Sequence, residues 1–396
     1  MAQVPGRDSR EREEAGGMEQ TKAFTIMMKD REVMRVDFDT LTYEVIQEKY
    51  LPYPIRGRLQ TIPHPGHILT MQDMTRSILA ARKNEDAVVS WLANRVLLLS
   101  RANAKWIYNL FCFEQVGTDE QRVKIALVCR AASVLDPYWL KYEEDGDISW
   151  SKVDVKQNPP NEIVAQVALH GKSLTLQGSC VTPELTTNGA YAKAWRRHED
   201  GTLWLYKLGA DGNTESRIEV MCSGLLDKMN VEHVHYEAGT DEDKYVCMCP
   251  CMTTQEKAVL TGMEFYSYCN VNGIDPDARM LEIDRESIYK MWIVDFLISN
   301  RDRHGQNWGF FYDTETMEIL GCHPLFDHNK AFDIAFMQDM DAPCQFGGMT
   351  MKQAARKAMD QVDFHFTASV TREDFITQRQ YASFKKRAEW LGLKME

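Results

Sequence analysis

Residues 295–309 read DFLISNRDRHGQNWG, and the predicted organisation of the whole chain follows from this stretch. The apolar run from Ile288 to Ile298 predicts the end of a buried helix, and the return of apolar residues at 308–312 predicts a strand. The loop between them is rich in carboxamides, Arg, His and Asp. Polar loops held at both ends by core elements are frequent sites of chemistry. The stretch therefore predicts a functional loop on a rigid support.

The spacing of two side chains in this loop points to phosphoryl transfer. Asp302 and Asn307 form the pattern D-x-x-x-x-N. Protein kinases use this interval in their catalytic loop, where the Asp accepts the proton of the substrate hydroxyl and the Asn holds Mg²⁺. Both side chains leave one tight loop and can reach the same γ-phosphate. A polar helix-to-strand turn with a capping Asp is the alternative, which the order of further residues disfavours.

A second carboxylate follows in the order that kinases use. Asp327, in the run PLFDHN at 324–329, lies 25 residues after Asp302 (327 − 302). A predicted hairpin at 310–320 separates the two. Because Mg²⁺ prefers oxygen ligands and keeps several waters, a carboxylate beside a carboxamide suits it. The chain thus presents a catalytic loop, two short strands and a metal-binding Asp in sequence.

The motif N-x-D-R-H-x-x-N, from Asn300 to Asn307, followed by an apolar run and Asp, resembles the HipA-like serine/threonine kinases. Their relatives include the CtkA-type bacterial kinases and, more distantly, the phosphatidylinositol kinases. The resemblance implies an α+β, bilobal protein-kinase-like fold that uses ATP and Mg²⁺. It also implies that Asp302 is the catalytic base and that Asn307 and Asp327 are Mg²⁺ ligands.

The resemblance implies a protein Ser or Thr as acceptor, with autophosphorylation on residues 182–187 included. A lipid or small-molecule kinase of the same fold is one alternative, and a nucleotide-binding pseudokinase acting as an interaction module is another. A toxin–antitoxin-like arrangement would add an antitoxin-like or regulatory partner, bound through the N-terminal part of the chain.

A candidate phosphate-binding lysine lies upstream. Residues 202–208, TLWLYKL, predict a strand with Lys207 near its end. By the resemblance, Lys207 contacts the ATP phosphates and pairs with a Glu of the next helix, which periodicity places at 214–229. Glu219 is our choice for that partner, because it lies beside the apolar face, whereas Glu215 lies in the first turn.

The loop before this strand departs from ordinary kinases. It holds a single Gly189 in place of G-x-G-x-x-G, a gap that HipA-like proteins share. Thr187, Gly189 and Lys193 are candidate phosphate contacts, with plain loop residues as the alternative. The adenine-binding connection would lie near Cys249 and Cys251, through backbone groups that leave little trace in the side chains.

The cysteines offer a second possible site. Residues 247–251 read CMCPC, a period of two inside a predicted strand. Zinc sites usually use C-x-x-C pairs, and no second pair is present, so buried strand cysteines are favoured over zinc. Ten cysteines without a secretory signal favour reduced thiols and a cytoplasmic protein.

Composition excludes several classes of protein. The chain has 396 residues, 44% of them hydrophobic, and a net charge of −12. That charge disfavours a general nucleic-acid binder. The chain has no run of 18 or more apolar residues, so no membrane helix is predicted. The length is enough for two or three domains.

Four segments are predicted along the chain. Residues 1–17 predict a disordered tail, 18–165 an α/β appendage, 166–252 a kinase N-lobe and 253–396 a helical C-lobe. The run Pro159-Pro160 is the preferred boundary of the appendage. Other predicted elements are a hairpin at 24–38, helices at 41–50, 85–102, 102–113 and 254–260, and strands at 233–236 and 244–249.

Overall fold

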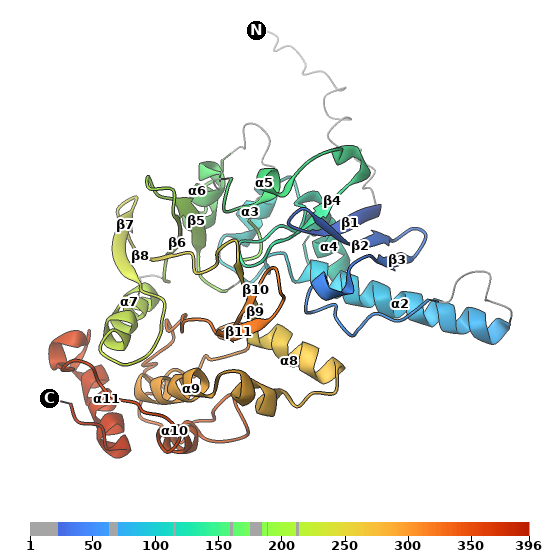
Figure 1. Ribbon diagram of the computed structural model, residues 1–396. Coiled ribbons are helices and arrows are strands. Elements are labelled where there is room, and N and C mark those ends of the chain that lie inside the picture. The colour runs from blue at the N-terminus through green and yellow to red at the C-terminus, as the bar shows by residue number, and fades with distance from the viewer. Residues whose placement is uncertain are drawn as a thin grey trace, which may run out of the picture.

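The computed structural model describes residues 23–62, 70–113, 116–158, 161–174, 184–187, 189–210 and 214–395. The tail predicted at 1–17 and the boundary at 159–160 lie outside these residues. Figure 1 shows the two four-stranded sheets in the upper part of the molecule, with several helices beside them, and the helices of the C-terminal part below. Within the described ranges, no helix combines the length and apolar character needed to cross a membrane.

The N-terminal part is built on an antiparallel sheet in the order β3-β2-β1-β4. The strands are β1 (Ala23–Met28), β2 (Arg31–Asp37), β3 (Thr42–Val45) and β4 (Tyr138–Lys141), and a short 3₁₀ turn, η1, spans Glu48–Tyr50. The β1–β2 hairpin confirms the prediction for residues 24–38.

Several helices belong to the same N-terminal part of the chain. They are α2 (Met71–Ala93), α3 (Ala104–Leu110), α4 (Asp119–Val128), α5 (Trp150–Val153) and α6 (Glu162–His170), with the 3₁₀ turn η3 at Glu143–Asp145. A reciprocal capping box between Thr70 and Asp73 starts α2 well before the predicted residue 85. Figure 1 shows the first half of α2 extending away from the body.

The second sheet carries the predicted lysine strand. Its order is β5-β6-β8-β7, and all neighbours are antiparallel. The strands are β5 (Lys193–Arg197), β6 (Leu203–Lys207), β7 (Glu237–Asp241) and β8 (Lys244–Pro250), and helix α7 (Thr214–Leu226) follows β6. The register pairs Lys193 with Lys207, so both lysines lie at the same end of the sheet. Cys247 and Cys249 of β8 are buried free thiols, as predicted.

The C-terminal part holds a three-stranded sheet and most of the larger helices. The elements are β9 (Lys257–Thr261), β10 (Gly309–Asp313), β11 (Ile319–Cys322), α8 (Gly262–Val271), α9 (Pro276–Leu297), α10 (Met351–Met359), η4 (Arg372–Asp374) and α11 (Gln378–Leu391). Helix α9 kinks at Asp284, whose carboxylate accepts hydrogen bonds from the backbone of Ser287 and Cys322. The kink fastens α9 to β11 and so directs its last turn toward the loop at 298–308.

One continuous hydrophobic core joins the N-terminal and C-terminal parts. Tyr53 illustrates the joint, because its hydroxyl donates to the carbonyl of Met317 at 2.6 Å and its ring packs edge-on against Tyr268 and Tyr312. The N-terminal part therefore packs on the C-terminal part through a shared core, and the domain boundaries remain predictions.

Three predicted elements are wrong. Residues 41–50 form β3 and η1 instead of a helix, because the segment pairs with the edge of β2. Residues 254–260 lead into β9, which pairs with β10, so sheet pairing overrides the apparent helical pattern. The strand predicted at 233–236 lies at 237–241, and His233 makes an isolated bridge to Leu325. The predicted α+β class, with a strand-rich part, a helical part and an N-terminal α/β unit, is confirmed.

Candidate active site

A cavity of about 290 Å³ lies between the second sheet and the helical part. It is lined by nine of the residues singled out in the sequence: Thr187, Gly189, Lys193, Lys207, Cys249, Cys251, Asp302, Asn307 and Asp327. Glu219 is fully buried and lies behind the cavity wall, in contact with Lys207. Segments more than 100 residues apart in the chain thus converge on one pocket.

Lys207 is the charged centre of the wall. Its Nζ lies 3.1 Å from Oδ1 of Asp327, 3.4 Å from Oε2 of Glu219 and 2.9 Å from the hydroxyl of Tyr236. Burial alone would lower the pKa of Lys207, but the two carboxylates outweigh it and raise that pKa well above its usual value. The ammonium group is therefore charged, and it holds strand β6, helix α7 and the Asp327 segment together.

The backbone around Asp327 is held in an unusual conformation. Asp327 has φ 60°, in the left-handed region that non-glycine residues seldom adopt. The conformation is fixed on one side by Glu219, whose Oε1 accepts the backbone N–H of His328 at 2.8 Å. On the other side, Lys207 and the amide of Asn329 both donate to Oδ1 of Asp327. Strained residues of this kind persist where surrounding contacts over-determine them, often at functional sites.

The catalytic-loop candidates are held by the loop itself. The side-chain amide of Asn307 donates to the backbone carbonyl of Asp302 at 2.8 Å. The backbone N–H of Asn307 donates to the carbonyl of His304, also at 2.8 Å. With its nitrogen used in this way, Asn307 has its side-chain oxygen left to face a ligand.

Arg303 is fully buried and connects this loop to the segment that carries Asp327. Its guanidinium pairs with Asp295 at 2.9 Å and donates to the carbonyls of Asn307 at 2.5 Å and Phe326 at 2.7 Å. Phe326 immediately precedes Asp327. One side chain thereby sets the distance between the loop at 302–307 and the segment at 326–327. Arg suits this position because its planar fork presents several donors at fixed angles.

Asp302 has an environment that suits a base. Its carboxylate is half-buried at the cavity wall. Partial burial, with a contribution from the Asp327 carboxylate, raises the pKa of Asp302 above its usual value. A carboxylate whose pKa is shifted toward neutrality accepts a proton from a substrate hydroxyl more readily.

Lys193 and Gly189 form the lip of the cavity. Gly189 has φ 114°, a conformation that favours glycine, and a Cβ there would collide with Nζ of Lys193. The absence of a side chain at Gly189 therefore lets the loop close over the lysine. Burial, together with the positive charges of Lys207 and Arg101, lowers the pKa of Lys193 to about 8, although Asp327 opposes the shift.

This lowered pKa predicts a pH-dependent affinity for anions. Lys193 is charged below about pH 8 and neutral above it, so the attraction for a phosphate weakens as the pH rises through that value. We expect ATP to bind more weakly at pH 9 than at pH 7. Fluorescence of Trp195, which lines the cavity, is a direct probe. Lys193→Arg should flatten the dependence, since Arg stays charged; an unchanged dependence in that variant would contradict the assignment.

In the connection after β8, the backbone N–H group of Cys251 that could contact adenine already makes a hydrogen bond within the protein. The backbone N–H of Cys251 donates to the carbonyl of Leu203 at 2.8 Å, so β6 already uses that donor. Thr253 donates its hydroxyl to the carbonyl of Val134 at 2.6 Å. The Cys249 side chain does line the cavity, beside Leu205 and other apolar groups. An adenine contact by Cys249 or Cys251 remains a prediction.

Several contributing residues were missed at the sequence level. Leu135 of the appendage lines the cavity, and its carbonyl accepts the backbone N–H of Val259. Tyr236 supplies its hydroxyl and ring to Lys207. The sequence offers little signal for either residue, because both reach the cavity only through tertiary packing. Arg303 stands within the motif, but nothing local shows that it is buried.

Comparisons with known proteins were made at three levels. No protein-family model matches the chain, and no curated protein matches it. The structure is similar to that of the Helicobacter pylori proinflammatory kinase CtkA, with 13% identity, 50% of this chain and 90% of that chain covered, and a TM-score of 0.35. It is also similar to HipA of Shewanella oneidensis MR-1, solved as a toxin–antitoxin complex with HipB and operator DNA. That likeness has 12% identity, covers 93% and 98% of the two chains, and has a TM-score of 0.49.

HipA and CtkA are the names of the group that the catalytic-loop motif resembles. Both likenesses are distant. The chemistry that the site can perform therefore depends on the positions of this chain's own side chains.

Proposed function

We propose that this protein is an ATP- and Mg²⁺-dependent kinase, and that a Ser or Thr of a protein is its acceptor. The observation that carries the proposal is the contact of Lys207 with both Glu219 and Asp327, at the wall of a cavity that Asp302 and Asn307 also line. A strand lysine, a helix glutamate, a loop Asp–Asn pair and a later Asp occur in the kinase order.

The donor groups fit a magnesium nucleotide. Asp327 and Asn307 offer oxygen atoms, which Mg²⁺ prefers. Burial alone would raise the pKa of Asp327, but the Lys207 ammonium outweighs this effect and lowers that pKa, so the carboxylate stays ionised. The cavity is also lined by apolar groups such as Leu205 and Val259, which suit a purine ring. When bound, Mg²⁺ neutralises charge on the phosphates, and ATP provides the phosphoryl group.

The chain's own residues would divide the work as follows. Lys207 would place a fixed positive charge against the nucleotide phosphates, while Asn307 and Asp327 would hold Mg²⁺. Asp302 would orient the acceptor hydroxyl and take its proton at the carboxylate. Arg303 would hold Asn307 and Asp327 at a fixed separation, through its hydrogen bonds to the carbonyls of Asn307 and Phe326. Preorganised charge of this type supplies much of the catalysis in phosphoryl transfer.

Autophosphorylation on Thr186 or Thr187 would require a local rearrangement. Thr187 donates its hydroxyl to Glu184 at 2.5 Å and accepts a bond from the indole of Trp195 at 2.7 Å. Thr186 is buried and bonded to Ser133 at 2.7 Å. Both hydroxyls are already held by hydrogen bonds, so an exposed acceptor on another protein is the simpler substrate. Residues 182–183 lie outside the described part of the chain.

A regulatory protein partner belongs to the same proposal. HipA of Shewanella oneidensis was solved with HipB and operator DNA. An antitoxin-like partner of this chain would bind the N-terminal appendage, which shares the cavity wall through Leu135. Such a partner would be positioned to change the shape of the site.

Incubation with γ-labelled ATP and Mg²⁺ tests the proposal. Three parallel reactions contain the protein alone, a generic protein substrate, and phosphatidylinositol vesicles. Label on protein Ser or Thr, abolished by chelation of Mg²⁺, is the expected result. Label that enters only lipid would replace the acceptor class. ATP binding without any transfer would establish a pseudokinase and overturn the enzymatic proposal.

A further inference from the structure

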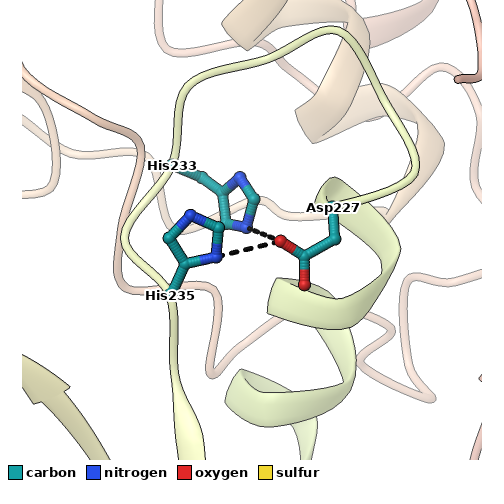
Figure 2. Close-up of side chains that lie close together, drawn as sticks. All are labelled: Asp227, His233 and His235. Carbon is teal, nitrogen blue, oxygen red and sulfur yellow. Dashed lines mark ion pairs between the residues drawn. The ribbon is translucent and has the colours of Figure 1, made fainter.

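A second polar cluster lies outside the cavity. Figure 2 shows the side chains of His233 and His235 pointing toward the carboxylate of Asp227. Asp227 directly follows helix α7, whereas both histidines belong to the segment before β7. Within the described ranges of the chain, it is the one group of three His, Cys, Asp or Glu side chains whose ligand atoms all lie within 4.8 Å of one another.

The separations between ligand atoms match those around a small cation. Nε2 of His233 lies 3.3 Å from Oδ1 of Asp227, and Nδ1 of His235 lies 2.9 Å from the same oxygen. Ligand atoms bound tetrahedrally at roughly 2.0–2.1 Å from a zinc ion are about 3.3 Å apart. All three ligand atoms lie within 4.8 Å of one another, so one ion between them would be within reach of each.

His233 is prepared for this role on its far side. Its Nδ1 lies 3.3 Å from the backbone carbonyl of Val231, which places the ring proton on Nδ1 and leaves a lone pair on Nε2. Nε2 is buried, makes no hydrogen bond and lies beside the carboxylate oxygen. In this tautomer Nε2 and the carboxylate oxygen both present lone pairs, which a cation between them would satisfy. Metal-binding histidines commonly show this pattern, with the other ring nitrogen donating to a carbonyl.

The exposed side of the cluster leaves room for further ligands. The side chain of His235 is 69% exposed and that of Asp227 is 49% exposed, whereas that of His233 is 3% exposed. One ligand is thus anchored in the protein and two face solvent, where water can complete the coordination of the ion. Imidazole and carboxylate ligands together suit Zn²⁺ and similar first-row ions better than Mg²⁺ or Ca²⁺.

We propose that Asp227, His233 and His235 form a binding site for a divalent transition metal of the zinc class, separate from the nucleotide cavity. The metal would clamp the end of α7 to the segment at 231–236. Hydrogen bonds already connect that segment to α7 and to the segment before Asp327. The backbone N–H of Tyr236 donates to Ser223 of α7, and that of Val234 donates to the carbonyl of Leu325. The clamp would therefore stabilise the helix that carries Glu219 against the segments that carry Tyr236 and Asp327.

Metal binding to the untagged full-length protein tests the site. Titration of Zn²⁺ at neutral pH, followed by calorimetry, should show one tight equivalent, and Co²⁺ should give visible absorption bands of a nitrogen- and oxygen-bound ion. We expect Zn²⁺ to raise the melting temperature and a chelator to reverse the rise. His235→Ala and Asp227→Asn should each weaken Zn²⁺ binding at least about tenfold, since each removes one ligand.

The surface pair His365 and Asp363 provides a matched control. Its atoms are 3.3 Å apart, but it has no third ligand among the described residues that meet the same distance limit. His365→Ala should bind Zn²⁺ as the wild type does. Equal Zn²⁺ binding by wild type and His235→Ala, both folded by circular dichroism, would overturn the proposal, as would an equal loss in His365→Ala. None of these measurements depends on phosphoryl transfer, so they stand apart from the proposed kinase activity.

Discussion

Replacing Asp302 with Asn should slow phosphoryl transfer by a factor on the order of 10² to 10⁴, the usual contribution of a general base. The Asn side chain has the same shape and fits the same half-buried position, but it cannot accept the proton of the acceptor hydroxyl. Lys207, Asn307 and Asp327 are untouched, so ATP and Mg²⁺ should bind as before. The measurement is a single-turnover assay with γ-labelled ATP, paired with calorimetry of ATP binding.

Asp360 supplies the control for this variant. It is exposed at the end of α10 and does not line the cavity, so Asp360→Asn should transfer phosphate at the wild-type rate. If Asp302→Asn also retains the wild-type rate, Asp302 is not the base. If it loses ATP binding as well, the residue acts in nucleotide binding and its assigned role is wrong.

The second large effect concerns Lys207. Lys207→Met keeps a long side chain but removes the ammonium group between Glu219 and Asp327. Loss of one partner from a buried ion pair costs about 3–5 kcal/mol, because the remaining charge is left uncompensated. We expect the free energy of unfolding to fall by an amount of that order at neutral pH, and transfer to fall by a factor on the order of 10² or more.

The pH dependence of this variant has a definite sign. In the wild type, Lys207 lowers the pKa of Asp327, so this carboxyl contributes stability above its ordinary pKa, and that contribution is lost as the pH falls. In Lys207→Met the buried carboxylates prefer their protonated forms, so the folded state gains protons and the variant becomes relatively more stable in acid. In urea unfolding experiments, the difference in free energy of unfolding between wild type and Lys207→Met should be smaller at pH 5 than at pH 7.

A surface lysine tests whether the effect is specific. Lys385 is half-exposed on α11 and lies 3.8 Å from Glu389. Lys385→Met should change the free energy of unfolding by less than about 1 kcal/mol at either pH. A Lys207→Met variant as stable as this control, with the same pH profile, would contradict the buried charge cluster.

The parts of the site that the sequence predicts are those encoded by short-range patterns. Asp302 and Asn307 share one loop, so their spacing alone indicates that they act together. Lys207 ends an apolar strand that the sequence predicts, and its choice as a site residue depended on the resemblance to HipA-like kinases. The predicted helix at 254–260 failed because a short mixed run supports either a helix or a strand, and pairing of β9 with β10 decided the outcome.

The residues that the sequence does not reveal act through tertiary contacts. Arg303 has the composition of an ordinary charged loop residue, and only the fold shows that it is buried against Asp295 and bonded to Phe326. Leu135 lies 167 residues before Asp302 in the chain (302 − 135), yet both line the cavity. No local pattern records such a distance. The positive φ of Asp327 is likewise set by its neighbours Glu219 and Lys207.

Calorimetry of ATP binding with and without Mg²⁺, in the wild type and in Asp327→Asn, tests most directly whether these side chains form a magnesium-nucleotide site. Mg²⁺ should strengthen ATP binding by the wild type by on the order of tenfold, because Asp327 and Asn307 would hold the ion and it would neutralise charge on the phosphates. In Asp327→Asn that gain should vanish while Mg²⁺-free binding persists. A variant that keeps the full gain from Mg²⁺ would show that Asp327 does not hold the ion, and the account of the site would be wrong.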